Sequence, residues 1–473
     1  MWKMYQTLWT RPKNRNGDSF AALDGVRAIS HLSIVALHSS MISTAHLPGQ
    51  GPVWDAVRLS PFHSIMQAGG IQVDVFFVLS GFLLTISLVN QLRVGKEISV
   101  FGQALRRMWR MMPLIIAATV FGSLVGEDWD PGYIGIYSTI LLYNNLLDPF
   151  RVGSFTLTLC WSCCVDFQAG IIVTLIVLAA HSRMVKDFLR MDPITLVKYT
   201  ALFVSMGTCA IRYVRYDPVK ANTIKLAQIN HFGRMMSDGG FSWIQNRYNH
   251  TWRTPNDARD TAHYYLEQLY LPTIPRMGPI FIGVVAACNY IHAKEWSKTR
   301  ESNPSASTIW IIASTLGKWI SIFWAFIQLF TPMIPSDPDN APDAVGLFVT
   351  VALRVLSSMA AAILIFSAVV PSSHPWHLGW LGRFLGWDIW LPISKISFAS
   401  YLIHFKILME AILRIPPPFV SSPADTPYYF AYVCVMNGVG LAISFTIATG
   451  LHLFVEQPAI RAFKSAKPSK KTV

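Results

Sequence analysis

The chain of 473 residues is 52% hydrophobic and only 14% charged. A soluble domain of ordinary composition has about a quarter charged residues, so these proportions exclude a soluble globular protein. The formal net charge of +13 would suit a nucleic-acid-binding protein, but apolar stretches of about 18 residues or more, long enough to cross a bilayer, recur along the chain. We therefore interpret it as a membrane protein that contacts lipids and binds no nucleic acid.

The apolar stretches predict an all-α, polytopic fold with about ten transmembrane helices and a long outer loop. The predicted spans are 24–46, 71–90, 111–127, 158–180, 197–214, 277–294, 308–330, 345–371, 396–415 and 428–455. More than half of the Lys and Arg residues fall in the terminal segments and the connections on one side of the predicted membrane. By the positive-inside rule, this side is the inner side. Both termini are therefore predicted on the cytoplasmic or matrix side, in an endomembrane, the plasma membrane or the mitochondrial inner membrane.

The predicted spans and the basic ends of the chain also predict the domain organisation. A basic inner segment (1–20) precedes a single membrane domain (21–460), which includes the outer loop 215–276, and a basic inner tail (461–473) follows.

The first span carries ionisable residues inside an apolar segment, FAALDGVRAISHLSIVALHSSMISTAH. Arg27 and His38 are eleven residues apart, which on a helix is about 1100° of rotation and a rise of about 16 Å, so both lie on one face. His31 lies between them on that face. Ionisable groups at this depth are costly in hydrocarbon and mark a functional site by default. The alternative is a short structural network in which Asp24 neutralises Arg27 one turn away.

The second span opens with GGIQVDVFFVLSGFLLT. Asp74 lies near its outer end and is a candidate site residue. The pair Ser80–Gly81, near the middle of the span, predicts a close approach between two helices, because small residues let helix backbones come together.

A basic inner segment, RVGKEISVFGQALRRMWRMMP, leads into the third span and contains Arg106, Arg107 and Arg110. Arg107 and Arg110 are three residues apart and share a helix face, so they are expected to present a fork of two guanidiniums. Guanidiniums bind phosphate in bidentate geometry. An ordinary positively charged membrane anchor is the alternative.

Residues 128–157 form an apolar run that is too short and interrupted for a span, and we predict an outer or re-entrant segment there. The fourth span begins with CWSCCVDFQAG. Its Asp166 is expected to pair with a histidine or a substrate hydroxyl, or else to join two helices. Cys160 and Cys163 lack a second ligand pair at zinc-site spacing, so no metal is expected.

The later spans contain further polar residues. Arg276 lies at the outer mouth of the sixth span and Arg354 inside the eighth, where it either snorkels or joins an interior network. In the ninth span, SKISFASYLIHFKILMEAIL, a second polar stripe is formed by Ser397, Tyr401 and His404 at i, i+4 and i+7.

Taken together, these segments resemble the acyltransferase family 3 membrane proteins, particularly the branch that includes the nose-resistant-to-fluoxetine proteins. The matching pieces come in family order and cover about residues 20–460: LDGVRAISHLSIVALH, GGIQVDVFFVLSGFL, RRMWRMMP, WSCCVDFQ, YLPTIPRMGPIFIGV, ISFASYLIH and VEQPAI. The Arg-x10-His signature is present as Arg27 and His38, and the Arg-x-x-Arg element as Arg107 and Arg110.

The resemblance implies an enzyme that moves an acyl group from acyl-CoA, its donor substrate, to a hydroxyl of a carbohydrate or lipid-like acceptor. In that family the histidine of the first helix is tied to acyl transfer and the arginines to the coenzyme. The chemistry of the residues fits, because a neutral histidine can take the proton of an attacking hydroxyl and guanidiniums can bind the phosphates of CoA. The candidate catalytic residues are thus His38, Arg27, Asp74, Asp166 and His404, and the candidate coenzyme-binding residues are Arg107, Arg110 and Arg106.

Two other functions remain open at this point. One is a non-catalytic, acyltransferase-like accessory subunit of a larger membrane complex, such as an assembly of the mitochondrial inner membrane, with other membrane subunits as partners. The other is a transporter for an acylated or amphipathic substrate, which would use the same polar interior.

Overall fold

The structure is a computed structural model. It describes residues 6, 8–11, 20–44, 53, 56–57, 60–125, 132–147, 159–216, 265–302, 314–324, 351–415 and 422–465. Within these ranges every regular element is a helix and there is no β-strand. The predicted all-α fold is confirmed.

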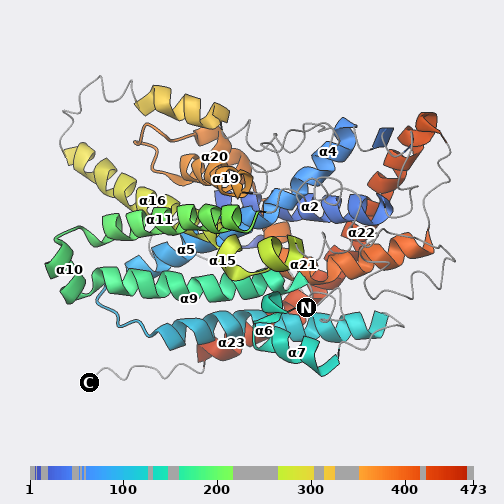
Figure 1. The fold of residues 1–473 in the computed structure, drawn as a ribbon, viewed down its shortest axis with the longest axis horizontal. Coiled ribbons are helices and arrows are strands. Elements are labelled where there is room, and N and C mark those ends of the chain that lie inside the picture. The colour runs from blue at the N-terminus through green and yellow to red at the C-terminus, as the bar shows by residue number, and fades with distance from the viewer. Residues whose placement is uncertain are drawn as a thin grey trace.

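Several long helices, among them α6, α9 and α11, run side by side along the longest axis of the molecule (Figure 1). The long helices of the described residues are α2 (Ala22–Thr44), α5 (Gln72–Arg93), α6 (Val100–Val125), α9 (Trp161–His181), α11 (Pro193–Val214), α16 (Gly278–Ser302), α19 (Leu353–Val369), α21 (Trp390–Arg414) and α22 (Thr426–Leu451). Shorter helical elements connect or flank them: α4 (Pro61–Gln67), η1 (Ala68–Ile71), α7 (Gly132–Ile140), η2 (Asn144–Leu146), α10 (Arg183–Leu189), η3 (Tyr265–Tyr270), α15 (Thr273–Arg276), α20 (Gly379–Leu385), η5 (Pro423–Asp425), η6 (His452–Glu456) and α23 (Gln457–Ser465).

Five of the helical stretches in the described ranges are long and apolar enough to cross a membrane: Gly69–Arg93, Val100–Val125, Trp161–His181, Pro193–Val214 and Pro423–Phe463. Helices α2, α16 and α21 are 23 to 25 residues long but more polar, as expected for helices that carry ionisable residues into a bundle. The chain is therefore a multi-pass membrane protein, with five clear spans among the described residues; parts of the seventh and eighth predicted spans lie outside these residues.

Helix α2 is at the centre of the packing, since it contacts α5 on one side and both α21 and α22 on another. The most extensive interface joins α5 to α16. There, a Cβ atom added to Gly81 would lie 2.0 Å from the carbonyl oxygen of Ile280, and one added to Gly283 would lie 2.1 Å from that of Val78. The two backbones touch through reciprocal glycines, which confirms the close approach predicted at Gly81.

The segment between the third and fourth spans contains no spanning helix in its described part, 132–147. Helix α7 has nine residues, a length of about 13 Å. The turn after it is docked on α9, where the Gln168 side-chain amide donates to the carbonyl of Leu142 (2.8 Å) and to Asn145 Oδ1 (3.1 Å). Asn145 Nδ2 donates to Thr273 Oγ1 at 2.9 Å, and the Thr273 hydroxyl donates to Gln168. A ring of three polar side chains thus ties η2, α9 and α15 together.

The described part of the N-terminal segment packs back onto the bundle. Arg11 forms ion pairs with Asp24 (3.3 Å) and Asp388 (2.8 Å) and donates to the carbonyl of Gly386 at 2.6 Å. Leu8 is buried in the main apolar core. This contact holds the chain against the start of α2.

Several sequence predictions fall outside the described residues. These are most of the outer loop (217–264), most of the seventh predicted span, the greater part of the N-terminal segment and the tail beyond residue 465. The predicted domain limits therefore stay predictions.

We predict that Gly81→Ala lowers the free energy of unfolding by about 1–3 kcal/mol or more, because the new methyl group would overlap a backbone oxygen that cannot turn away. The measurement is thermal unfolding of the purified protein in detergent. Gly438→Ala is the matched control, since a Cβ there meets nothing within 4 Å and alanine has the better helix propensity. Equal stability of the two variants would contradict the backbone contact.

Candidate active site in the bundle interior

Two imidazoles meet across the interface between α2 and α21. His38 Nδ1 lies 2.7 Å from His404 Nε2, and the rings stack with centroids 5.0 Å apart and planes 16° apart. His404 is fully buried and His38 partly buried. The structure therefore brings together the polar faces of the first and ninth predicted spans.

The hydrogen bonds of His404 define which nitrogen of each ring carries a proton. His404 Nδ1 is 2.8 Å from the carbonyl of Tyr401 and 3.2 Å from that of Ser400. A carbonyl oxygen can only accept, so Nδ1 of His404 is the protonated nitrogen and its Nε2 is an acceptor in the neutral ring. His38 Nδ1 then donates to His404 Nε2, and His38 keeps its lone pair on Nε2. A base with this orientation can take a proton from a hydroxyl group.

Arg27 lies on the same helix as His38, eleven residues earlier and nearer the N-terminal end of α2. The charge of Arg27 interacts with those of Arg110 and Asp24. Asp24 also accepts from Ser394 Oγ at 3.1 Å and pairs with Arg11, so its carboxylate is shared and does not belong to Arg27 alone. The structural alternative, in which Asp24 neutralises Arg27, therefore also involves Ser394 and Arg11 as partners of Asp24.

Arg107 turns into the bundle toward α9. Its Nη2 lies 2.6 Å from Asp166 Oδ2 and 2.9 Å from Ser80 Oγ. The absence of a side chain at Gly170 makes room, since a Cβ there would be 2.7 Å from the guanidinium carbon of Arg107. Asp166 thus joins two helices, the second of the roles considered for it.

Arg110 has different surroundings from Arg107. It is exposed and interacts electrostatically with Arg27, whereas Arg106 donates to Gln103 Oε1 at 3.3 Å. Arg107 is thus held by Asp166, whereas Arg110, three residues later, lies on the exposed surface within electrostatic range of Arg27.

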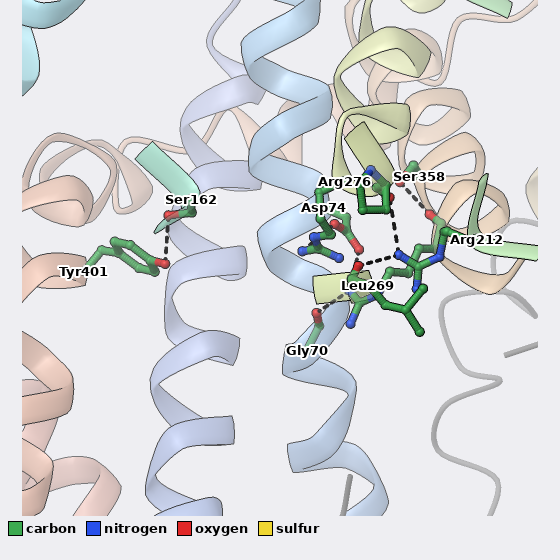
Figure 2. Close-up of polar contacts among 10 residues, drawn as sticks. Gly70, Asp74, Ser162, Arg212, Leu269, Arg276, Ser358 and Tyr401 are labelled. Atoms are coloured by element: carbon green, nitrogen blue, oxygen red, sulfur yellow. Dashed lines mark hydrogen bonds and ion pairs between the residues drawn. The ribbon is translucent and has the colours of Figure 1, made fainter. Parts of the chain in front are cut away.

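Asp74 lies in a separate, buried ion cluster (Figure 2). Its oxygens are 3.0 Å from Arg276 Nη2 and 2.8 Å from Arg354 Nη1, and both Asp74 and Arg276 are fully buried. The Arg276 guanidinium also lies over the rings of Tyr270 (4.8 Å) and Trp161 (5.0 Å). This cluster joins α5, α15 and α19, and the two arginines engage the carboxylate of a candidate catalytic residue.

Arg212 extends this cluster toward α11. It is buried and donates from Nη1 to the carbonyls of Leu269 (2.9 Å) and Pro275 (3.3 Å), as Figure 2 shows. Ser162 and Tyr401 form a second contact, at 3.0 Å, well apart from the arginines in the same view.

Several of these residues were missed in the sequence. Arg212 lies near the end of the predicted span 197–214 and was not singled out, and Ser400 lies outside the i, i+4, i+7 stripe. His63 of α4 was not singled out either, yet it is buried with Nδ1 3.3 Å from Ser40 Oγ, and burial lowers its pKa to about 4. A further buried pair lies within η6, where His452 Nδ1 donates to the Glu456 carboxylate at 2.6 Å.

Fold and site together define a helical, multi-pass membrane protein with a hydrogen-bonded pair of imidazoles in its interior. A family model described as an acyltransferase domain, acyltransferase family 3, matches residues 20–448. The chain belongs to this family, which indicates a membrane acyltransferase. No curated protein and no solved structure matched the chain.

We predict that Asp74→Asn lowers the free energy of unfolding by about 3–5 kcal/mol, because it leaves buried guanidiniums without their carboxylate. The measurement is thermal unfolding in detergent. Asp187→Asn on the exposed side of α10 is the control and is expected to stay within about 0.5 kcal/mol of the parent. A stable Asp74→Asn protein would show that the cluster does not hold these helices.

Proposed function

We propose that the protein is an integral membrane O-acyltransferase that moves an acyl group from acyl-CoA to a hydroxyl of a carbohydrate or lipid-like acceptor. The observation that carries this proposal is the 2.7 Å contact of His38 with His404, which leaves the lone pair of His38 on Nε2. Membership of the acyltransferase family supports the reaction class. The motif resemblance supports the nose-resistant-to-fluoxetine-like branch.

In the proposed reaction, His38 Nε2 takes the proton of the acceptor hydroxyl while the hydroxyl oxygen attacks the thioester carbonyl. The new C–O bond forms, the C–S bond breaks, and the leaving CoA thiolate receives the proton from the His38 imidazolium. The products are an ester and free CoA. General base catalysis of this kind contributes about 10²- to 10⁴-fold to a rate.

The donor is proposed to approach from the end of the bundle that holds Arg110. Arg110 and Arg27, whose charges interact, are suited to bind the CoA phosphates, with Arg106 nearby on α6. From Arg27 to His38 the helix rises about 16 Å, the distance that the pantetheine arm would have to cover. This direction agrees with the positive-inside prediction that both termini lie on the cytoplasmic or matrix side.

Arg107, Asp166 and Asp74 have supporting roles in this proposal. Arg107 and Asp166 fix α6 to α9, and the Asp74 cluster fixes α5 to α15 and α19. Each acts by holding helices that surround the imidazole pair, and none needs to touch the acyl group.

We predict that His38→Ala lowers kcat/KM by about 10²-fold or more, since the general base is lost. The assay supplies acyl-CoA donors of several chain lengths and a panel of hydroxyl acceptors to the protein in nanodiscs, and follows release of CoA and formation of ester by mass spectrometry. His181→Gln is the control, because this histidine lies at the end of α9 and bonds only to its own helix in the described structure.

Ester formation that survives His38→Ala unchanged would overturn the catalytic assignment. A wild-type protein that transfers no acyl group and co-purifies with a fixed set of membrane subunits would favour the accessory-subunit alternative.

We also predict that Arg110→Gln raises the KM for acyl-CoA about tenfold with little change in kcat. Loss of one charge-assisted hydrogen bond costs about 1.5–3 kcal/mol, and an interaction equally strong in ground and transition states affects KM alone. Steady-state kinetics over a range of acyl-CoA concentrations measure this. Arg183→Gln, another exposed arginine, is expected to leave KM unchanged; an equal rise for both variants would mean that only general positive charge matters.

A further inference from the structure

A second polar contact crosses the same helix interface as the imidazole pair. His31 Nε2 lies 2.8 Å from Ser400 Oγ. His31 is about two turns from His38 on α2, and Ser400 is about one turn from His404 on α21. The two helices are therefore joined by side-chain hydrogen bonds at two successive levels.

His31 has no exposed surface. Its ring packs on Phe445 of α22, with centroids 5.9 Å apart, and meets the edge of His404 at the same centroid distance. Its other nitrogen, Nδ1, is buried and has no hydrogen-bond partner among the described residues. Within that part of the chain, the hydroxyl of Ser400 is the polar contact that fixes this imidazole.

Ser400 connects the two levels. Its hydroxyl contacts His31, while its backbone carbonyl accepts from His404 Nδ1 at 3.2 Å. That carbonyl, with the one of Tyr401, holds the His404 proton on Nδ1 and so leaves Nε2 to accept from His38. A shift or rotation of α21 at Ser400 would change the geometry of the imidazole pair directly.

We propose that His31 and Ser400 are positioning residues for the acyl-transfer base: their hydrogen bond fixes α21 against α2 so that His404 Nε2 faces His38 Nδ1. This inference rests on the proposed function of His38. His31 acts through Ser400 and His404 and touches neither donor nor acceptor. Displacement of a catalytic group by about 1 Å is enough to reduce a rate about 10²-fold.

The test compares Ser400→Ala, His31→Phe and His31→Gln in nanodiscs. Ser400→Ala removes only the hydroxyl and keeps the backbone carbonyl, so it remains informative if His31→Phe does not fold. His31→Gln can restore a hydrogen bond to Ser400. Ser397→Ala is the matched control, because Ser397 is a buried serine of the same helix whose hydroxyl bonds only to the carbonyl of Ser394 in the described structure.

Two readouts are needed. Steady-state kinetics give kcat and the KM for acyl-CoA separately. Nitrogen-15 NMR of labelled histidine, with signals assigned from His38→Ala and His404→Ala, reports which ring nitrogens are protonated and whether His38 and His404 share a hydrogen bond. The NMR readout does not depend on activity.

For Ser400→Ala and His31→Phe we expect kcat to fall about tenfold or more, KM to stay within about twofold, and the signal of the His38–His404 hydrogen bond to weaken. His31→Gln is expected to recover most of the rate, and Ser397→Ala to match the wild type. Unchanged His38 and His404 signals in Ser400→Ala and His31→Phe would overturn the inference, as would a rise in KM at constant kcat, which indicates a donor contact. An inactive wild type whose imidazole signal is still lost in Ser400→Ala would overturn the proposed function and support the positioning role.

Discussion

An ionised side chain inside an apolar helix bundle must meet an opposite charge or a hydrogen-bonding partner, and the interior of this protein is arranged around that requirement. Asp74 meets Arg276 and Arg354, while Arg107 meets Asp166. Each of these contacts joins helices that are distant in sequence. The imidazole pair differs from them because each ring is the hydrogen-bond partner of the other. The charged clusters therefore support the fold around the imidazole pair.

Helical periodicity within one span is enough to predict which of its polar residues share a face. Arg27, His31 and His38 were placed on one face of the first span from their spacing alone, and in the structure His31 and His38 both reach α21. The glycine at position 81 predicted a close helix contact for the same kind of local reason, because the absence of a side chain matters wherever two helices cross. Features that depend on the spacing of residues within one helix can be derived from one sequence.

Spacing within one helix does not predict which side chain of another helix pairs with a given charged residue. Arg107 and Arg110 share a helix face in the sequence, yet Arg107 turns to Asp166 on α9 and Arg110 remains exposed. The partners of Asp74 come from α15 and α19, about 200 and 280 residues further along the chain. Spacing within a helix does not reveal which distant helix supplies a counter-charge. The predicted spans 24–46, 277–294 and 396–415 fall on α2, α16 and α21, but α16 and α21 are longer than predicted, with 25 residues each.

The reciprocal glycines of α5 and α16 also bear on how the molecule can move. Where two backbones touch directly, no layer of side chains lies between them to slide or change rotamer, so this pair behaves as a rigid spine. Helix α2 lies between the spine and the α21–α22 pair, and its contacts to α21 include polar bonds that can break and re-form. A sliding movement between helices is therefore expected at interfaces that, unlike the α5–α16 contact, have side chains between the two backbones.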